Sequence, residues 1–224
     1  MFRLFALLPL AAACGGGDDG FGVGGTPGDF NQVAATPECG VLSQACIGQG
    51  LNAPIARGST VDLRIEYKVP GSSGPPIEVE SANEAVLRQT AATSLEAVDE
   101  GMSAILFTGP DGAVIDLVHV FVQKPAELRI NRYDASGDLL GQIQPSGTLL
   151  PGDELLVAVE AYANGQALLG RYPLTYGSNN GAAVQILEDP VFGWYRIVAR
   201  TAGVAKLSFA ALGLDVAWDV EVLP

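Results

Sequence analysis

The sequence predicts an all-β protein: two tandem β-sandwiches after a disordered N-terminal tether. Most of the chain consists of short segments in which apolar and polar residues alternate, as over residues 61–67 and 214–222. These segments are bounded by Gly, Pro, Asn, Asp or Ser, and no window has the periodicity of a sustained amphipathic helix. Several landmarks recur about 100 residues apart, which is typical of a duplicated unit.

The first element is an N-terminal signal segment. Arg3 precedes an apolar run over residues 4–13, which ends in small residues directly before Cys14. This layout is typical of a secretory signal peptide over residues 1–13, and the run is shorter than the ~20 apolar residues that span a bilayer. We therefore expect the chain to be exported.

The segment Ala-Ala-Ala-Cys that ends at Cys14 resembles the lipobox of bacterial lipoproteins. In that family the cysteine receives a diacylglycerol, and the new N-terminus is acylated with a fatty acid such as palmitate. The resemblance implies that Cys14 anchors the chain to a membrane. Because Gly15 follows the cysteine, the resemblance also implies that this membrane is the outer membrane. The residues alone leave an alternative, an ordinary signal peptide whose removal leaves Cys14 as a free thiol.

Residues 14–50 are expected to form the tether and a small loop. Residues 15–37 contain eight glycines, three aspartates and two prolines, which leave little to bury. Cys39 and Cys46 follow, and an exported compartment favours a disulfide between them. A metal or redox pair is the alternative, although the six intervening residues differ from the two of such motifs.

The remaining chain is expected to contain two sandwiches, over residues 51–125 and 126–224. The expected strands cover residues 61–67, 104–108, 114–122, 127–133, 155–162, 195–199, 205–210 and 214–222. The recurring landmarks are residues 57–60 with 151–154, 81–83 with 177–180, and 100–105 with 202–207. Two copies of one fold explain this recurrence.

The two copies resemble group 2 bacterial immunoglobulin-like domains. The first copy reads VESANEAVL, EGMSAILF and VIDLVHVFVQKP, and the second reads TYGSNNGAAV, AGVAKLSF and LDVAWDVEVLP. Tyr176 stands where that family has a tryptophan, and Val79 does so in the first copy. The resemblance implies two immunoglobulin-like (Ig-like) sandwiches over roughly residues 51–224.

Composition narrows the classes of partner. The net charge of −13 argues against nucleic acid, whose phosphates would repel the chain. It also argues against binding to an anionic membrane through protein contacts, so membrane attachment is assigned to the lipid. No cofactor or metal is expected, because the chain has one histidine and no cluster of free cysteines.

Few residues are candidates for chemistry. His119 has no Gly-x-Ser-x-Gly partner motif and is interpreted as a packed or edge residue. Asp134 and Asp138 are interpreted as a hairpin turn rather than a catalytic pair. Trp218 is expected in the core. Trp194 and Tyr195 are adjacent on a strand and point to opposite faces, so one of them is the candidate partner contact.

These observations predict a non-enzymatic, lipid-anchored protein of the cell envelope whose Ig-like modules bind a partner or act as a spacer or scaffold. The alternative is an adhesin or carbohydrate-binding module that uses exposed aromatic residues of the second sandwich. The partner is expected to be a protein or a glycan.

Overall fold

The computed structural model describes residues 25–38, 44–68, 76–189 and 193–224. The signal segment, Cys14 and Cys39 lie outside these residues, so export, lipidation and the disulfide stay predictions. The all-β prediction is confirmed. The described residues form strands β1–β19, one short helix, α1 (Gln44–Gln49), and the 3₁₀ turn η1 (Gly50–Asn52).

The first sandwich packs one sheet of order β1-β2-β4-β7-β6 against a second of order β3-β9-β8-β5. Its strands are β1 (Thr26–Pro27), β2 (Val33–Pro37), β3 (Ile55–Ala56), β4 (Thr60–Tyr67), β5 (Glu78–Ser81), β6 (Leu87–Ala91), β7 (Ser94–Ala97), β8 (Gly101–Thr108) and β9 (Val114–Gln123). Its core contains the fully buried side chains of Phe107, Leu87 and Leu95.

The second sandwich packs the sheet β11-β10-β13-β17-β16 against the sheet β12-β19-β18-β15, and β14 pairs with β13. Its strands are β10 (Glu127–Tyr133), β11 (Leu139–Gln142), β12 (Ser146–Leu149), β13 (Glu154–Ala163), β14 (Gln166–Ala167), β15 (Thr175–Ser178), β16 (Val184–Glu188), β17 (Trp194–Ala199), β18 (Gly203–Ala211) and β19 (Leu214–Val222). Its core contains Phe209 and Trp218, as expected for Trp218.

The two sandwiches share one topology, and it is Ig-like. The order β2-β4-β7-β6 corresponds to β10-β13-β17-β16, and both are the A-B-E-D sheet of an immunoglobulin domain. The orders β3-β9-β8-β5 and β12-β19-β18-β15 are the matching sheet of strands G, F and C, with a short strand added beside G. That added strand is parallel to its neighbour in both copies, β3 to β9 and β12 to β19.

The sequence landmarks hold equivalent turns in the two copies. Gly101 begins β8 and Gly203 begins β18, with φ of +143° and +151°, which a glycine adopts without strain. The carbonyl of Asn83 accepts hydrogen bonds from the backbone amides of Val86 and Leu87, and the carbonyl of Asn180 accepts the equivalent pair. The recurrence in the sequence therefore reflects backbone conformation.

The tether was predicted too long, because residues 26–37 belong to the first sandwich. β2 pairs with β4 throughout its length, in the position that β10 occupies in the second sandwich. Ala45, Cys46, Leu51 and Ala53 are also buried in the first core. The first sandwich thus begins well before residue 51.

Asp116 fixes this N-terminal segment. Its carboxylate accepts hydrogen bonds from the backbone amides of Phe30 and Gln32 at 2.8 Å and of Val33 at 2.9 Å. The backbone amide of Leu117 donates a fourth, at 2.9 Å. Burial acts to raise the pKa of Asp116, but these four donors outweigh it and lower the pKa. An ionised carboxylate therefore holds the β1–β2 turn.

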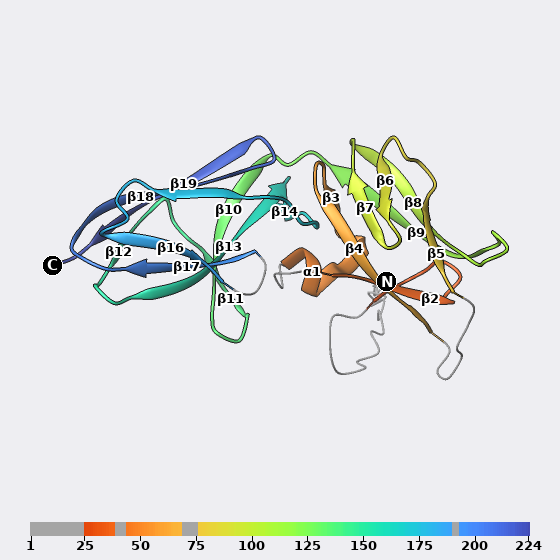
Figure 1. Ribbon diagram of the computed structural model, residues 1–224, viewed down its shortest axis with the longest axis horizontal. Helices are drawn as coiled ribbons and strands as arrows, with labels where there is room; N and C mark the ends of the chain where they lie inside the picture. The colour runs from red at the N-terminus through yellow and green to blue at the C-terminus, as the bar shows by residue number, and fades with distance from the viewer. Residues whose placement is uncertain (1–24, 39–43, 69–75, 190–192) are drawn as a thin grey trace, which may run out of the picture.

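The sandwiches lie end to end along the long axis of the molecule (Figure 1) and are joined by more than the linker at residues 124–126. Residues 166–174, here called the strap, leave the second sandwich and run along β3 and β4 of the first. Leu169 exchanges backbone hydrogen bonds with Pro54 and Ala56, and Arg171 exchanges two with Thr60, all at 2.8–2.9 Å. Tyr162, Ala167 and Leu169 are buried in the first core.

Candidate functional site

A cleft of about 270 Å³ lies at the junction of the two sandwiches. The first sandwich contributes Glu38 and residues near the start of β4, and the second contributes the strap and parts of β13 and β17. The cleft is lined by Pro37, Glu38, Thr60, Val61, Ala158, Val159, Glu160, Leu168, Leu169, Gly170, Arg171, Tyr172, Pro173, Leu174, Glu188, Gly193 and Tyr195. Domain junctions are a common place for ligand sites, so this cleft is the first candidate.

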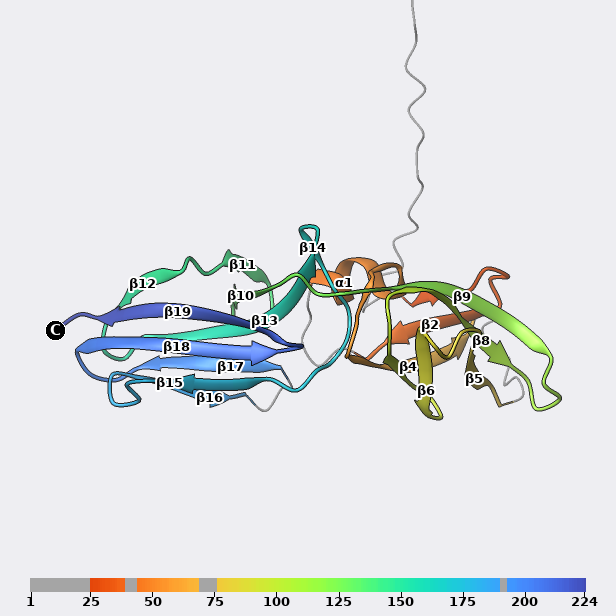
Figure 2. The ribbon, with the colours of Figure 1, turned by 90° about the horizontal axis from the view of Figure 1, so that it is seen from above.

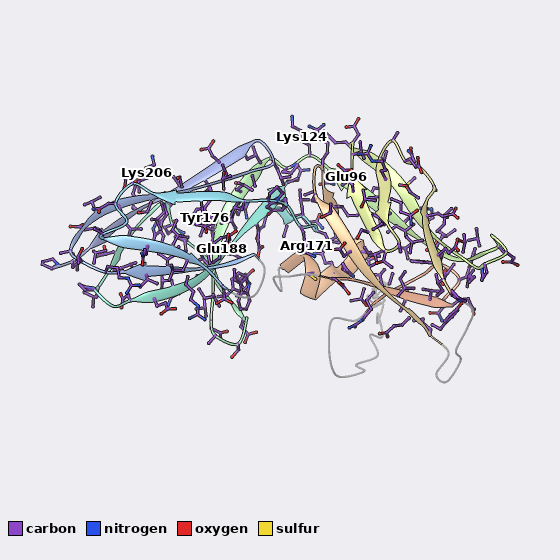
Figure 3. The ribbon with its side chains drawn as sticks, viewed as in Figure 1. Glu96, Lys124, Arg171, Tyr176, Glu188 and Lys206 are labelled. Carbon is purple, nitrogen blue, oxygen red and sulfur yellow. The ribbon has the colours of Figure 1, made fainter. Side chains whose placement is uncertain are left out.

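The lining of the cleft is mainly acidic among its charged residues. Glu38, Glu160 and Glu188 contribute carboxylates, and Arg171 is the basic residue of the described lining. Figure 3 places Arg171 between the two sandwiches, and its Nη1 atom lies 2.7 Å from Oδ2 of Asp62 in β4. The described lining contains no His, Ser or Cys, so it offers no nucleophile paired with a histidine.

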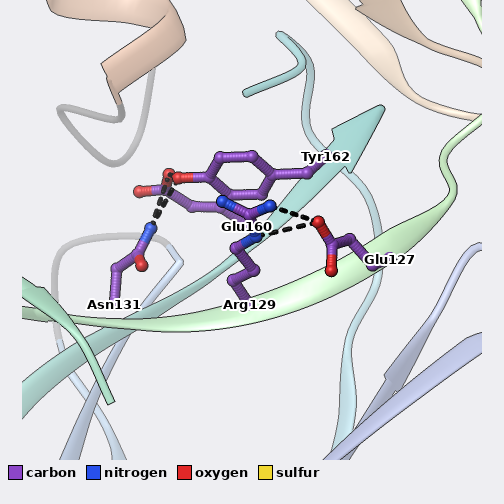
Figure 4. A network of polar contacts seen from close by, with 5 residues as sticks. All are labelled: Glu127, Arg129, Asn131, Glu160 and Tyr162. Atoms are coloured by element: carbon purple, nitrogen blue, oxygen red, sulfur yellow. Dashed lines mark hydrogen bonds and ion pairs between the residues drawn. The ribbon is translucent and has the colours of Figure 1, made fainter. Parts of the chain in front are cut away.

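Glu160 is the most deeply buried of these carboxylates, with 5% of its surface exposed. It lies on the outer face of β13 and receives hydrogen bonds from three side chains. Figure 4 shows Glu160 with two of them, Asn131 and Tyr162. Nδ2 of Asn131 donates to Oε2 at 3.0 Å, the hydroxyl of Tyr162 donates to Oε2 at 3.3 Å, and the hydroxyl of Tyr133 donates to Oε1. Both carboxylate oxygens are therefore occupied by donors from β10 and β13.

Burial raises the pKa of the Glu160 carboxyl, and the hydrogen bonds from Tyr133, Asn131 and Tyr162 counter it only in part. Burial and the neighbouring carboxylate also raise the pKa of Tyr133 and Tyr162. Arg129 lies 4.1 Å from the ring centroid of Tyr162 and forms an ion pair with Glu127. This network holds β10 on β13, and its donors and acceptors are engaged with one another rather than with the cleft.

Neither Trp194 nor Tyr195 is exposed, although one of them was expected to be an exposed partner contact. Tyr195 is buried: its ring lies 5.0 Å from that of Tyr176 and 6.0 Å from that of Phe209. Trp194 points to the opposite face, as expected, but is half-buried, with its ring 6.0 Å from that of Tyr133. Tyr133 covers Trp194, and the second core encloses Tyr195.

The other described residues that the sequence analysis considered do not line the cleft. His119 is exposed on β9, with Nδ1 3.1 Å from Oδ2 of Asp29. The segment 134–138 is a hairpin turn, as predicted: the Asp134 side chain accepts hydrogen bonds from the amides of Ser136 and Asp138. Cys46 is buried in the first core, and its predicted partner Cys39 lies outside the described residues, so the pairing stays a prediction.

In the part of the chain that the structure describes, no helix is long and apolar enough to cross a membrane. No group of three or more His, Cys, Asp or Glu residues there is arranged to hold a metal ion.

No protein-family model and no curated protein matches this chain. Among solved structures, domains 4 and 5 of the S-layer protein SbsC match with 12% identity and a TM-score of 0.31, over 86% of this chain and 98% of that one. FdeC, an Escherichia coli adhesin, matches with 13% identity and a TM-score of 0.32, over 88% of this chain and 65% of that one. InvD of Yersinia pseudotuberculosis matches with 13% identity and a TM-score of 0.32, over 75% of this chain and 54% of that one.

The chain spans 28% of the longer SbsC structure that covers residues 31–844. At these TM-scores the matches carry no argument about function, and the Ig-like fold is assigned from the strand order described above.

Neither Glu160, which lines the cleft, nor the strap, which joins the two sandwiches, was singled out in the sequence. Glu160 carried a usable signal, because it is the one charged residue within the otherwise apolar segment LLVAVEAYA of β13. The strap carried none, since its turn residues and apolar residues resemble those of an ordinary loop.

Proposed function

We propose that this chain is an exported, lipid-anchored protein of the cell envelope, in which two Ig-like sandwiches form one stiff, non-enzymatic binding and spacer unit. The observation that carries the proposal is the strap. Its residue Leu169 is 2% exposed within the core of the first sandwich, although it belongs to the second.

Three features support a stiff unit. Backbone hydrogen bonds link the strap to β3 and β4 over residues 54–60. Nε2 of Gln166 donates to Oε1 of Gln49 at 2.9 Å, and Arg171 pairs with Asp62. A flexible pair of domains would need only the linker near Pro125, and domain interfaces without such buried contacts allow relative motion.

The anchor follows from the lipobox-like segment that ends at Cys14. Cys14→Ser should move the protein from the detergent phase to the aqueous phase and abolish labelling by radioactive palmitate. Gly17→Ser, which changes the following glycine-rich segment, is the matched control and should leave both readouts unchanged. Wild-type-like partitioning and labelling of Cys14→Ser would contradict the anchor.

The spacer is tested on the full chain that carries Cys14→Ser. Small-angle X-ray scattering should give one elongated particle whose profile fits two sandwiches end to end. A profile that requires an ensemble of bent and straight particles would contradict a stiff unit and leave the anchor untouched.

A further inference from the structure

The first sandwich carries an apolar strip on the outer face of its β5-β8-β9 sheet. Met102 and Phe121 are cross-strand partners there and are 55% and 53% exposed. Ala104 pairs with His119 on the same face, and Leu106 pairs with Leu117. The strip therefore places five apolar side chains on two central strands, around His119, which pairs with Asp29. So many apolar side chains are unusual for a face that meets water.

The second sandwich provides an internal comparison for this face. Because Gly101 and Gly203 begin equivalent strands and pair with Val122 and Val222, the registers of β8–β9 and β18–β19 match residue by residue from Gly101 to Phe107, where β8–β9 has a bulge. The pairs equivalent to those of the strip are Val204 with Glu221, Lys206 with Asp219, and Ser208 with Ala217. Lys206 is labelled on β18 in Figure 3. The same face of the same fold is thus charged in one copy and apolar in the other.

One edge of the strip is acidic. Glu80 of β5 pairs with Leu106, and Glu78 pairs with Thr108, and both glutamates are exposed. The equivalent positions of β15 are Gly177, which pairs with Ser208, and Thr175, which pairs with Ala210. The first copy therefore differs from the second at this edge as well, by two carboxylates placed next to the apolar strip.

We propose that the strip, with Glu78 and Glu80, is a docking surface for a partner protein whose contact face carries apolar side chains bordered by Lys or Arg. Apolar contact with Met102 and Phe121 would supply most of the binding free energy, as central aromatic residues do in interfaces. The glutamates would pair with the basic residues and set the orientation. The inference rests on the proposed role as a binding unit and names the surface and the partner.

Charge separates this partner from a second copy of the chain. Two strips packed face to face would bring four glutamates to one interface, between chains that each carry a net charge of −13. Like charges placed opposite one another disfavour such pairing. A basic partner relieves this repulsion.

The test uses the full chain with Cys14→Ser, so it is independent of the lipid anchor. Its probes are three fluorescent peptides of equal length that alternate Leu with Lys, Leu with Glu, or Ser with Lys, measured by anisotropy at physiological salt. The Leu/Lys peptide should bind, and the other two should bind at least about tenfold more weakly, because each lacks one of the two contributions.

Substitutions then locate the site. Phe121→Glu should weaken Leu/Lys binding by about tenfold or more, as loss of a central aromatic contact does. The fold should tolerate it, because the second sandwich carries Glu221 at the equivalent position. Leu117→Ala, which installs the residue found at Ala217, is a milder second variant, and Glu80→Gln should reduce the dependence of binding on salt. Val204→Glu, at the position equivalent to Met102, is the matched control and should bind as the parent chain does.

Three results would overturn the docking surface. One is equal loss of binding in Val204→Glu and Phe121→Glu. Another is equal affinity for the Leu/Glu peptide. The third is a dimer in analytical ultracentrifugation that Phe121→Glu dissociates, since the occupant would then be a second copy. The first two results leave the scattering profile that tests the spacer unchanged. In the third case the monomeric Phe121→Glu variant gives the profile that tests the spacer.

Discussion

Gly170 of the strap lies against Ser59 of the first sandwich so closely that a Cβ atom at position 170 would be 2.0 Å from Ser59 Oγ. Ser59 is fully buried, and its hydroxyl donates to the carbonyl of Ala56 at 2.6 Å. The Ser59 side chain can move aside only by giving up this hydrogen bond, and Gly170 lies between Leu169 and Arg171, whose backbones bond to the first sandwich. The close approach of these two residues is therefore a point at which the junction can be tested.

Gly170→Ala should destabilise the junction. The new methyl group would overlap the Ser59 side chain at a backbone φ of +124°, so we expect a loss of about 2–4 kcal/mol from strain and overpacking together. Urea unfolding of the full chain measures it. Gly165→Ala is the control: φ there is +78°, but no atom lies within 4 Å of the added Cβ, so only the smaller strain remains. Equal losses in both variants would show that the contact with Ser59 is unimportant.

The burial of the strap in the first sandwich also leads to a prediction for the isolated second sandwich. Residues 126–224 contain a complete Ig-like strand set and should fold alone, with a β-type circular dichroism spectrum and a cooperative melt. Trp218→Ala should cost about 3–5 kcal/mol in the fragment and in the full chain, since this core is the same in both. Leu169→Ala should cost about 2–3 kcal/mol in the full chain only, because the fragment lacks the core that buries this side chain. A fragment that stays unfolded would mean that the sandwiches are not independent.

Asp116→Asn should weaken the attachment of residues 26–37. An amide group cannot accept the same four backbone hydrogen bonds, and we expect a loss of about 3 kcal/mol at neutral pH. Because the pKa of Asp116 is lowered, this stabilisation is present above the unfolded value of about 3.9 and is lost as the pH falls further. Unfolding free energies of both proteins measured down to pH 2 should therefore converge.

The control for Asp116 is Asp111→Asn, in the turn between β8 and β9. The Asp111 carboxylate is exposed and accepts one hydrogen bond, from the amide of Ala113 at 3.1 Å. Its substitution should cost less than about 1 kcal/mol. A loss as large as that of Asp116→Asn would contradict the role assigned to the buried carboxylate.

Glu160 predicts pH dependence of the opposite sign. A carboxyl whose pKa is raised in the folded state keeps its proton above the unfolded value of about 4.3, so stability decreases as the pH rises through the folded pKa. Glu160→Gln removes the group that titrates. The unfolding free energy of this variant minus that of the parent chain should therefore increase between pH 4 and pH 8. Tyr133→Phe, which removes a donor to the carboxylate, should extend the decline to higher pH. A constant difference between parent and Glu160→Gln across this range would contradict the assignment.

The fold was predictable where burial is one-sided. Residues 61–67 and 214–222 alternate because one face of β4 and of β19 meets a core, and both strands are confirmed at nearly those bounds. Strands of four or five residues leave little room for a pattern and were missed, namely β5, β6, β7, β11, β12, β15 and β16. β2 was assigned to the tether because the carboxylate that orders its turn lies more than 80 residues away in the sequence.

The site was less predictable than the fold. Strand geometry sends Trp194 and Tyr195 to opposite faces, but the sequence does not reveal that Tyr133 covers Trp194. The contrast between Phe121 and Glu221 is present in the sequence, yet it has meaning only once the registers of β8–β9 and β18–β19 are known. Long-range register therefore separates what the sequence reveals from what the structure adds.

The parallel pairing of β12 with β19 has a mechanical consequence. The second sandwich is entered at the junction, and the chain ends after β19 at the opposite end of the molecule (Figure 1). Tension along the long axis would pull β12 and β19 past each other in opposite directions. The hydrogen bonds of a parallel pair are evenly spaced, so they share this shear load. They therefore have to rupture together rather than one after another. The same parallel geometry recurs between β3 and β9, over the two residue pairs Ile55–Val122 and Ala56–Gln123.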